Sequence, residues 1–206
     1  MQLLDIGNTN IKIYKNSRIR TISIKKFDKL KLQEQFYYIC VNQTLKERLK
    51  TLKQSIDVAK YFKFKTNYRG LGVDRVAACY SIKNGVIVDI GSAISIDVMQ
   101  NSIHQGGILL PGITAFENSF KSISPILNDQ IDFDIDLNIL PNSTKEAISF
   151  GVLKSIILLI WSVAKDKKIY FTGGDGKMVQ KFFENSVYKK NLVFDGMKKA
   201  IMEREC

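Results

Sequence analysis

Residues 3–14 read LLDIGNTNIKIY, and residues 87–98 read IVDIGSAISIDV. Each stretch has two apolar residues, then Asp-Ile-Gly, then two small residues and a segment in which apolar side chains alternate with others. A short apolar run that passes through a glycine turn into a period-two pattern predicts a β-hairpin. The repeat of this hairpin 84 residues later indicates a duplication, and its long period predicts two related α/β halves.

The two turns carry residues suited to holding phosphate groups. Glycine in a turn lets backbone N–H groups approach phosphate oxygens, and Asn8, Thr9 and Ser92 add side-chain donors. Asp5 and Asp89 come at the ends of the first strands, and two such carboxylates in facing positions would hold a cation such as Mg²⁺. Since Asp-Ile-Gly alone is a common strand-turn sequence, the prediction of a polyphosphate clamp depends on the repeat.

The remainder of the chain alternates between predicted strands and helices, which is typical of α/β proteins. We expect strands or extended segments at 36–41, 56–64, 104–111, 168–172 and 191–194, and helices at 42–52, 69–82, before Pro125, at 143–165, after Asp175 and from Gly196. The early antiparallel hairpin argues against a purely parallel Rossmann sheet. The sequence contains neither a GxGxxG fingerprint nor a GxxxxGK[ST] P-loop.

The composition is that of a globular cytoplasmic protein. Of the 206 residues, 45% are hydrophobic and 25% charged, so the chain can bury a core. Cys40, Cys79 and Cys206 are odd in number and widely spaced, which favours reduced thiols over a disulfide framework. The N-terminus lacks the basic region of a signal peptide, and the apolar stretch 155–164 is about half a membrane span, so we expect a buried helix there.

The net charge of +11 is unevenly distributed. Residues 1–83 carry 18 Lys+Arg and 6 Asp+Glu, and residues 84–206 carry the other 13 and 14. A basic half is compatible with nucleic-acid binding. However, the basic residues are scattered, no run reaches five, and no base-stacking aromatic motif accompanies them. A solvated lysine-rich surface is therefore the preferred interpretation, and nucleic acid is not expected as a partner.

Six motifs in order resemble one known family. They are DIGNT at 5–9, GVDR at 72–75, VDIGSAISID at 88–97, GGILLPG at 106–112, STKEA at 143–147 and TGGD at 172–175. Together they cover nearly the whole chain and resemble type III pantothenate kinase, a branch of the acetate and sugar kinase/Hsp70/actin superfamily. The resemblance implies a duplicated ribonuclease-H-like (actin-like ATPase) α/β fold, with mixed sheets in domains 1–84 and 85–206 and a cleft between them.

The same resemblance implies a function. Family members phosphorylate pantothenate with ATP, the first step of coenzyme A synthesis, as homodimers that need Mg²⁺ and a monovalent cation, K⁺ or NH₄⁺. Carried over, Asp74 is the general base, Asp89 binds the monovalent cation and Asp5 helps to hold Mg²⁺. The implied ATP-binding residues are Asp5, Ile6, Gly7, Asn8, Thr9, Asn10, Ile11, Lys12, Ser92, Gly173 and Gly174. The implied pantothenate-binding residues are Tyr68, Gly72, Val73, Asp74, Arg75 and Thr144.

Several of these residues also have structural interpretations. Asp74 at a helix start would complement the helix dipole, and Arg75 would serve equally well in a salt bridge. Thr144 lies in a capping box, and Gly173 with Gly174 would simply end a strand. Tyr68 is an open case between a pocket residue and a surface residue.

Asp97 and His104 are interpreted differently from the site residues. We expect Asp97 in the second hairpin to be structural. His104, the only histidine, is expected at the surface or in a hydrogen bond rather than as a ligand or base. The sequence also departs from many relatives in having Ser92 and Ser95 in place of threonines, and Asn67-Tyr68-Arg69 where an Asn-Pro pair is common.

Two other functions remain as alternatives. Another kinase of the superfamily, acting on a sugar or short acid, would share the phosphate hairpins but not the GVDR segment. A non-catalytic DNA-associated regulator with this fold would exploit the basic N-terminal half. The presence of Asp5, Asp74 and Asp89 argues against the regulator, because a regulator has no need of catalytic acids.

Overall fold

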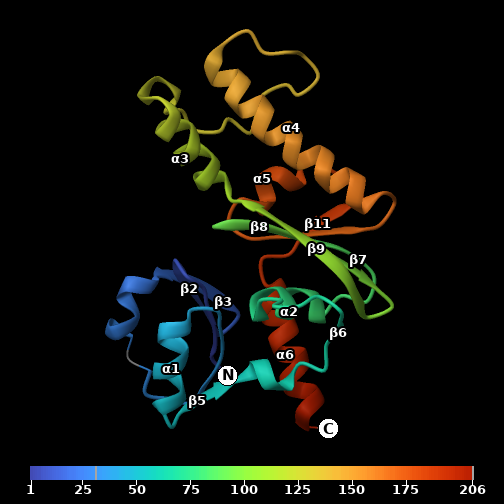
Figure 1. Cartoon of the computed structure of the whole chain (residues 1–206). Helices are drawn as coiled ribbons and strands as arrows, with labels where there is room; N and C mark the ends of the chain where they lie inside the picture. Colours follow the sequence, from blue (N-terminus) through green and yellow to red (C-terminus); the bar gives the residue numbers. More distant parts are fainter. Residues whose placement is uncertain (31, 206) are drawn as a thin grey trace. The chain divides into compact units, whose positions relative to one another are not determined.

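The chain divides into two compact units, drawn in Figure 1. A computed structural model describes residues 1–30 and 32–205, so Cys206 lies outside the described part. Unit 1 comprises Met1–Lys83, Asn101–His104 and Asn191–Cys206, and unit 2 comprises Asn84–Gln100 and Gln105–Lys190. The first division falls one residue from the predicted end of the N-terminal domain. The units differ from the predicted ranges mainly in the C-terminal segment from Asn191, which belongs to unit 1.

Unit 1 is built on a mixed five-stranded sheet of order β3-β2-β1-β4-β5. Its strands are β1 (Leu3–Ile6), β2 (Asn10–Lys15), β3 (Arg18–Ser23), β4 (Phe36–Cys40) and β5 (Ser55–Asp57). β1 and β2 form the predicted antiparallel hairpin, with Leu3 opposite Tyr14, whereas β4 runs parallel to β1 and β5 parallel to β4. The first hairpin prediction is therefore confirmed.

The other elements of unit 1 are η1 (Ile24–Lys29), α1 (Gln43–Thr51), η2 (Val58–Tyr61), the short β6 (Lys65–Thr66), α2 (Val73–Tyr80) and α6 (Leu192–Glu205). α1 begins as expected, because the Asn42 side chain accepts a hydrogen bond from the Leu45 amide at 3.0 Å. The segment 56–64 was predicted to be extended, which is wrong beyond Asp57. The Asp57 carboxylate caps η2 through the Ala59 amide, and a helical turn replaces the strand.

Side chains of β1 and β4 alternate between two covered faces of the sheet. Leu4, Ile6 and Tyr38 pack in a cluster with Leu45 and Leu49 of α1. Strand geometry sends neighbouring residues to the opposite face, which α2 and α6 cover. Leu3 and Asp5 therefore share the face beneath α2 and α6.

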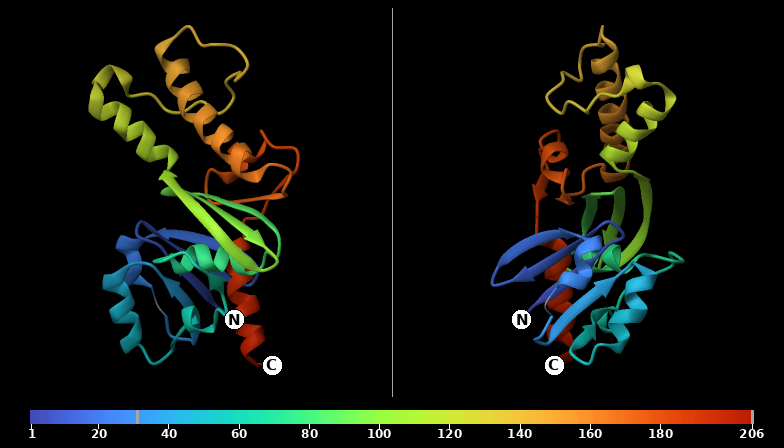
Figure 2. Two further views of the ribbon diagram at one scale, coloured as in Figure 1. Left: turned by 45° about the vertical axis from the view of Figure 1, so that its right-hand side comes forward. Right: turned by 90° about the vertical axis from the view of Figure 1, so that its left-hand side faces the viewer.

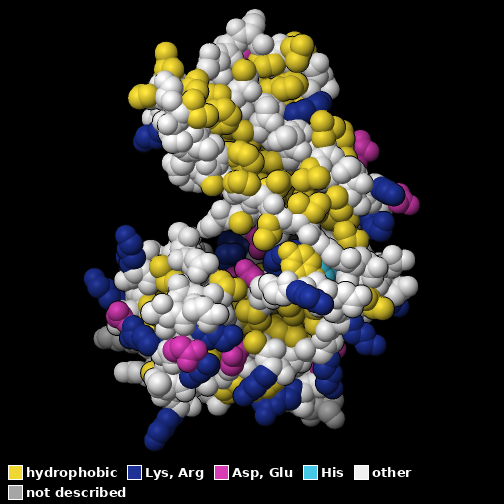
Figure 3. Space-filling model, viewed as in Figure 1, with side chains coloured by type: hydrophobic (Ala, Val, Ile, Leu, Met, Phe, Trp, Pro, Cys, Tyr) yellow, Lys and Arg dark blue, Asp and Glu magenta, His cyan; other side chains and the backbone are white. Residues whose placement is uncertain are grey.

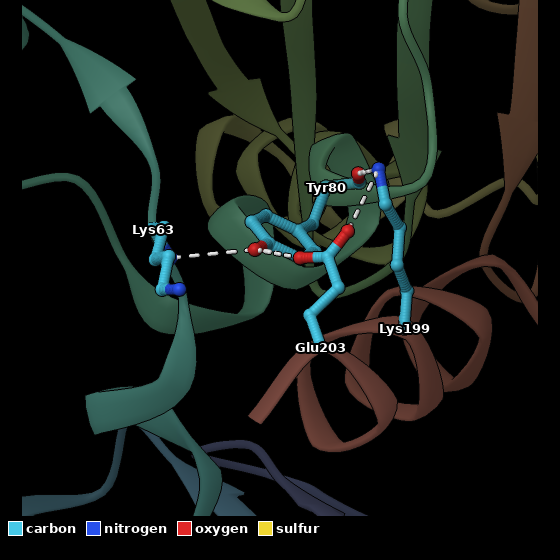
Figure 4. Close-up of polar contacts among 4 residues, drawn as sticks. All are labelled: Lys63, Tyr80, Lys199 and Glu203. Carbon is cyan, nitrogen blue, oxygen red and sulfur yellow. Dashed lines mark hydrogen bonds and ion pairs between the residues drawn. The ribbon is translucent and has the colours of Figure 1, made fainter. Parts of the chain in front are cut away.

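Helix α6 packs against α2 and also forms hydrogen bonds with it (Figures 2 and 4). The Tyr80 hydroxyl donates to Glu203 at 2.5 Å and accepts from the Lys63 amide at 3.4 Å. Lys199 donates to the Tyr80 carbonyl at 3.1 Å. Burial, followed by the hydrogen bond to Glu203, raises the pKa of Tyr80, so this phenol keeps its proton and its donor role at neutral pH.

The predicted strand at 191–194 is wrong, because those residues enter α6, which begins at Leu192. Leu192, Val193 and Phe194 are buried, and their apolar run was mistaken for a buried strand. The strand lies earlier, at β11 (Ser186–Tyr188). A short apolar run does not distinguish a strand from a turn of a buried helix. Here packing against α2 favours the helix.

Unit 2 repeats the topology of unit 1. Its strands are β7 (Gly85–Ile90), β8 (Ala93–Gln100), β9 (Ile103–Pro111), β10 (Ile169–Thr172) and β11, in the order β11-β10-β7-β8-β9. Each unit thus has an antiparallel meander of three strands followed by two parallel strands, and the second sheet has β6 as a sixth strand beside β9. The second hairpin and the duplication are confirmed. The first two residues of β9 belong to unit 1, where they pair with β6.

The helices of unit 2 are α3 (Ile113–Ile123), η3 (Pro125–Leu127), α4 (Thr144–Ala164) and α5 (Gly176–Gln180). Residues 86, 88 and 90 of β7 point into a core with α4, which contributes Val152 and Ile156 among others. The side chain of Asp89 therefore lies on the opposite face.

Helix α4 confirms the helix predicted at 143–165, which contains the apolar stretch 155–164. It has 21 residues, and an 18-residue window within it has a mean hydropathy of 2.0. By length and composition alone, the helix could therefore cross a membrane, although 44% of that window is buried inside the fold. A helix that is apolar on most sides is typical either of a membrane span or of a protein core. The packing of Leu153 and Ile160 within the cluster around β7 supports the second interpretation.

Candidate functional site

In unit 1, the turn between β1 and β2 is held by backbone contacts. The Gly7 amide donates to the Asn10 carbonyl at 3.0 Å, and the Ile24 amide donates to the Thr9 carbonyl at 2.9 Å. Asp5 is 7% exposed and lies 3.8 Å from the ammonium of Lys12, its partner across the hairpin. The predicted ATP segment 5–12 is thus one hairpin tip with an anchored carboxylate at its base.

The GVDR segment begins α2 next to the same turn. The Val41 amide, which follows β4, donates to the Ile6 carbonyl at 3.0 Å. A Cβ atom built on Gly72 would lie 4.0 Å from the Val41 side chain. Val41 therefore connects the carboxyl end of β1 to Gly72, the N-cap of α2. The structure brings the predicted phosphate turn and the predicted substrate segment together within unit 1.

Asp74 and Arg75 occupy the first turn of α2. Oδ1 of Asp74 accepts from the Arg75 amide at 2.8 Å. The same atom would lie 2.5 Å from a Cβ atom on Gly72, so a larger residue there would displace the carboxylate. Asp74 also lies where an acid complements the helix dipole, so its position fits both the catalytic and the structural interpretation.

Arg75 is buried against Tyr68. The guanidinium carbon lies 4.9 Å from the centre of the Tyr68 ring, and Nη1 donates to the Tyr68 hydroxyl at 3.4 Å. Only 8% of Arg75 is exposed. A guanidinium stacked on an aromatic ring is held in one orientation, which suits two-pronged binding of a carboxylate.

In unit 2, the end of β7 is packed tightly against the loop after β10. Asp89 pairs with Ser95 of β8 and with Thr172 of β10. Gly173 has φ +88°, and a Cβ atom on it would lie 2.2 Å from the Ile90 carbonyl and 2.4 Å from Oδ1 of Asp89. Only glycine allows this approach, which places Asp89 beside the Gly173 backbone.

A third loop completes this arrangement in unit 2. The Gly112 amide donates to the Ser92 carbonyl at 3.2 Å, and a Cβ atom on Gly112 would lie 2.2 Å from the Gly91 carbonyl. The turn at 91–92, the start of α3 and the loop 173–175 therefore meet at one end of the sheet. This glycine-lined meeting of backbones is suited to cradling phosphate oxygens.

Sequence reasoning missed Gly112 and Asp175 as members of this cluster. The Asp175 amide donates to the Ile90 carbonyl at 3.2 Å. Burial raises the pKa of Asp175, and the charge of Glu117 adds to the effect. Both residues stand in quoted motifs, GGILLPG and TGGD, so motif position was the available signal.

The remaining predicted residues take distinct places. Thr144 is exposed at the start of α4, whereas Ser143 is the N-cap and accepts from the Glu146 amide at 3.4 Å. Asp97 is 1% exposed in β8. His104 is 3% exposed, and its Nδ1 is 2.8 Å from the Thr66 hydroxyl, so it is a hydrogen-bonded interior residue. Cys40 and Cys79 are buried, and neither is in a disulfide in the described part of the chain.

Within residues 1–30 and 32–205, no group of three or more His, Cys, Asp or Glu side chains is placed to hold a metal ion. Mg²⁺ in phosphate-transfer sites is commonly held by one or two carboxylates together with substrate phosphates and waters. Asp5, nearly buried at the base of the 5–12 turn, is a donor of that kind. The donor set therefore fits a metal brought in with a nucleotide.

These two related α/β units, each with a glycine turn after its first strand and an aspartate beside it, define a protein of the actin-like ATPase fold. Solved structures agree on the fold: a 2-dehydro-3-deoxygalactonokinase from Sinorhizobium meliloti has a TM-score of 0.56 at 8% identity, covering 98% of this chain and 96% of that one. MreB5 of Spiroplasma citri has a TM-score of 0.53 at 13% identity, covering 99% and 97%.

The particular family is shown by closer relatives. The profile of the type III pantothenate kinase family matches residues 40–166. Type III pantothenate kinases from Campylobacter jejuni strain RM1221 and Helicobacter hepaticus are 47% and 46% identical, covering 98% of this chain and 97% and 98% of theirs. A solved Campylobacter jejuni structure described as a Baf family transcriptional activator is 45% identical, with a TM-score of 0.93 over 100% and 99% of the chains. This chain belongs to the type III pantothenate kinase family.

Proposed function

We propose that this protein phosphorylates pantothenate with ATP, giving 4'-phosphopantothenate in the first step of coenzyme A biosynthesis. The observation that carries the proposal is the 47% identity to a type III pantothenate kinase over 98% of the chain. Asp5 in β1 and Asp74 in the first turn of α2 belong to unit 1, and Asp89 in β7 belongs to unit 2. These are the acids to which the proposed reaction assigns roles.

The proposed roles divide by unit. In unit 1, the hairpin tip from Asp5 to Lys12 binds ATP phosphates, and the segment from Tyr68 to Arg75 binds pantothenate. In unit 2, the backbone around Ser92, Gly173 and Gly174 contributes to ATP binding, and exposed Thr144 contributes to pantothenate binding. These assignments are supported by the glycine-lined turns and by the cation–π contact that orients Arg75.

Phosphoryl transfer requires positioning and charge neutralisation more than covalent catalysis by the protein. The pantothenate hydroxyl oxygen forms the new bond to the γ-phosphorus, the bond to the ADP oxygen breaks, and Asp74 takes up the hydroxyl proton. Arg75 pairs with the pantothenate carboxylate at the other end of the substrate. Asp5 would help to hold Mg²⁺ when the nucleotide is bound, and the metal would neutralise charge on the phosphates.

We assign the monovalent cation, K⁺ or NH₄⁺, to Asp89. We expect Asp89→Asn to reduce activation by K⁺ several-fold, because the amide keeps the size of the side chain but removes the anionic charge that holds the cation. Turnover at saturating ATP and pantothenate is measured while Na⁺ is replaced by K⁺. Asp166→Asn, at an exposed position in unit 2 with the same charge change, is the control. Equal K⁺ activation in the two variants would reject the assignment.

We propose a homodimer formed through unit 2. Apolar side chains gather over α3 and α4 in Figure 3. Ile123 and Ile126 are 72% and 82% exposed, and Leu158 and Trp161 on α4 are 49% and 50% exposed. Large exposed apolar areas often mark interaction surfaces. A second copy of this chain is the partner that the family resemblance implies.

The dimer is tested by light scattering coupled to gel filtration. The chain has a mass of 23.4 kDa, and we expect the native protein at twice that value. Replacing Ile123 and Ile126 together by lysine places two charges on the apolar surface, so the double variant is expected to be monomeric. Met178→Lys changes an exposed apolar residue of α5 and should remain dimeric. A native monomer, or a dimeric double variant, would contradict this interface.

A cytoplasmic location goes with this function, because ATP is the phosphate donor. We place the enzyme there. The helix α4 is then a core helix of unit 2.

A regulatory function is the second candidate. It is favoured by one observation, the description of the 45% identical Campylobacter jejuni structure as a transcriptional activator. The net charge of +11 would assist binding to DNA. Tight binding to duplex DNA that weakens steeply with salt, together with no ATP turnover, would favour this candidate over the kinase.

A substrate panel tests the kinase proposal against other acceptors. Pantothenate, simple sugars and short carboxylic acids are incubated with ATP, Mg²⁺ and K⁺, and the phosphorylated product is identified by mass spectrometry. Among these acceptors, we expect only pantothenate to give a product, which carries one phosphate on its primary hydroxyl. Equal or greater product with a sugar or short acid would assign the site to another kinase of the superfamily.

A further inference from the structure

The only histidine of the chain is buried next to the predicted substrate segment. His104 is the second residue of β9 and pairs with Thr66 of β6 in unit 1. Its side chain is interior, with 3% of the residue exposed, and its Nδ1 lies 2.8 Å from the Thr66 hydroxyl. A polar ring is not placed in the interior without a partner, and the Thr66 hydroxyl is one partner of this imidazole.

The Thr66 hydroxyl serves two groups at once. Besides His104, it accepts a hydrogen bond from the Tyr68 amide at 3.0 Å. A hydroxyl has two acceptor lone pairs and one proton, so it can satisfy both. The imidazole therefore fixes the rotamer of Thr66, and Thr66 fixes the backbone at Tyr68, where the segment leading to Gly72 begins.

The ring of His104 also packs against the side chain of Tyr68. The centres of the His104 and Tyr68 rings are 5.9 Å apart, with an angle of 61° between the ring planes. The centre of the Phe64 ring lies 5.7 Å from the centre of the imidazole. Tyr68 in turn carries the Arg75 guanidinium, 4.9 Å from its ring centre and hydrogen-bonded to its hydroxyl. A continuous set of contacts thus runs from His104 through Tyr68 to Arg75.

We propose that His104 is a positioning residue for pantothenate binding, acting through Thr66 and Tyr68 on Arg75. The inference rests on the proposed function and deepens it, because neither His104 nor Thr66 is among the residues assigned to the site. His104 does not touch the reacting atoms. It holds the aromatic support of the guanidinium that receives the substrate carboxylate.

Kinetics on matched variants test the hydrogen-bonded part of this set. Thr66→Val keeps the shape of the side chain but loses the hydroxyl, and His104→Leu removes the ring nitrogen. Each is expected to raise the KM for pantothenate about tenfold, a change typical of losing one buried hydrogen bond, and to leave the KM for ATP within about twofold. Thr66→Ser and His104→Asn keep a polar atom at the contact and are expected to recover most of the affinity.

A purely structural role is separated from positioning by a stability control. Leu49→Ala opens a cavity beneath α1, on the other face of the sheet, and is expected to lower the Tm of the protein without changing the KM for pantothenate. If the KM values of all variants follow their Tm values, Leu49→Ala included, the positioning role is overturned. If Thr66→Val and His104→Leu leave the KM for pantothenate unchanged, it is overturned as well.

A spectroscopic readout is available because the chain has one histidine. In untagged ¹⁵N-labelled protein, long-range ¹H–¹⁵N spectra contain a single imidazole. Pantothenate added without ATP is expected to shift its nitrogen signals in the native protein and to shift them less in Thr66→Val. If the native enzyme phosphorylates pantothenate but the imidazole nitrogen signals do not shift, the positioning role of His104 is overturned and the proposed function stands. A native protein that does not phosphorylate pantothenate would instead overturn the proposed function and, with it, this inference.

Discussion

Replacing Asp74 by asparagine is expected to lower kcat by about 10²–10⁴-fold, the range typical of losing a general base. Asparagine retains an Oδ1 atom in the place where Asp74 accepts from the Arg75 amide at 2.8 Å, so the first turn of α2 should keep its geometry. What is lost is the capacity to take the proton from the pantothenate hydroxyl. Steady-state turnover measures the loss, and circular dichroism verifies the fold.

The control for this prediction is Asp28→Asn. Asp28 is an exposed acid of η1 that pairs with Arg48 at 2.7 Å, and exposed pairs contribute little to stability. We expect this variant to turn over at the native rate. If Asp74→Asn remained within twofold of the native kcat, the acid would be a helix-start residue that complements the dipole, and the base would have to be sought elsewhere.

Gly196→Ala is expected to give the largest loss of stability among the glycine substitutions in helices. A Cβ atom on Gly196 would lie 1.8 Å from the Ala77 carbonyl oxygen, which belongs to the backbone of α2 and has no flexible side chain to move aside. The two helices must separate, so we expect the free energy of unfolding to fall by about 3 kcal/mol, the upper end for overpacking. Urea denaturation followed by circular dichroism measures the change.

Gly151→Ala is the matched control for Gly196→Ala. Gly151 lies in α4 with no atom within 4 Å of the added Cβ, so the same change meets open space. Because alanine is the better helix former, this variant is expected to be more stable by about 1 kcal/mol. Opposite signs for the two variants would demonstrate the close approach of α2 and α6. A neutral Gly196→Ala would show that α6 is not held as described.

The fold was predictable where the pattern was both long and repeated. The hairpins at 3–14 and 87–98 appear as β1–β2 and β7–β8, because alternation and glycine turns are local signals. The C-terminal run at 191–194 failed for the opposite reason. Its apolar residues are buried by α2, which lies over a hundred residues earlier in the chain, and no local pattern records that contact.

The sequence predicted which residues belong to the site, but not the contacts that hold them in place. Motif order identified the acids, but not the approach of Gly112 to Gly91, which depends on two loops folding onto the same end of a sheet. His104 had no signal in the sequence beyond being unique. Its importance comes from the short β6–β9 pairing, which places Thr66 and the Tyr68 backbone within its reach.

The most direct test of the central claim is ADP release by the purified protein with ATP and Mg²⁺, with and without pantothenate, in K⁺ and then in Na⁺. We predict turnover that depends on pantothenate and is greater in K⁺. ADP release that pantothenate does not increase in either salt, from a protein that still binds ATP, would contradict the assignment of this chain as a pantothenate kinase.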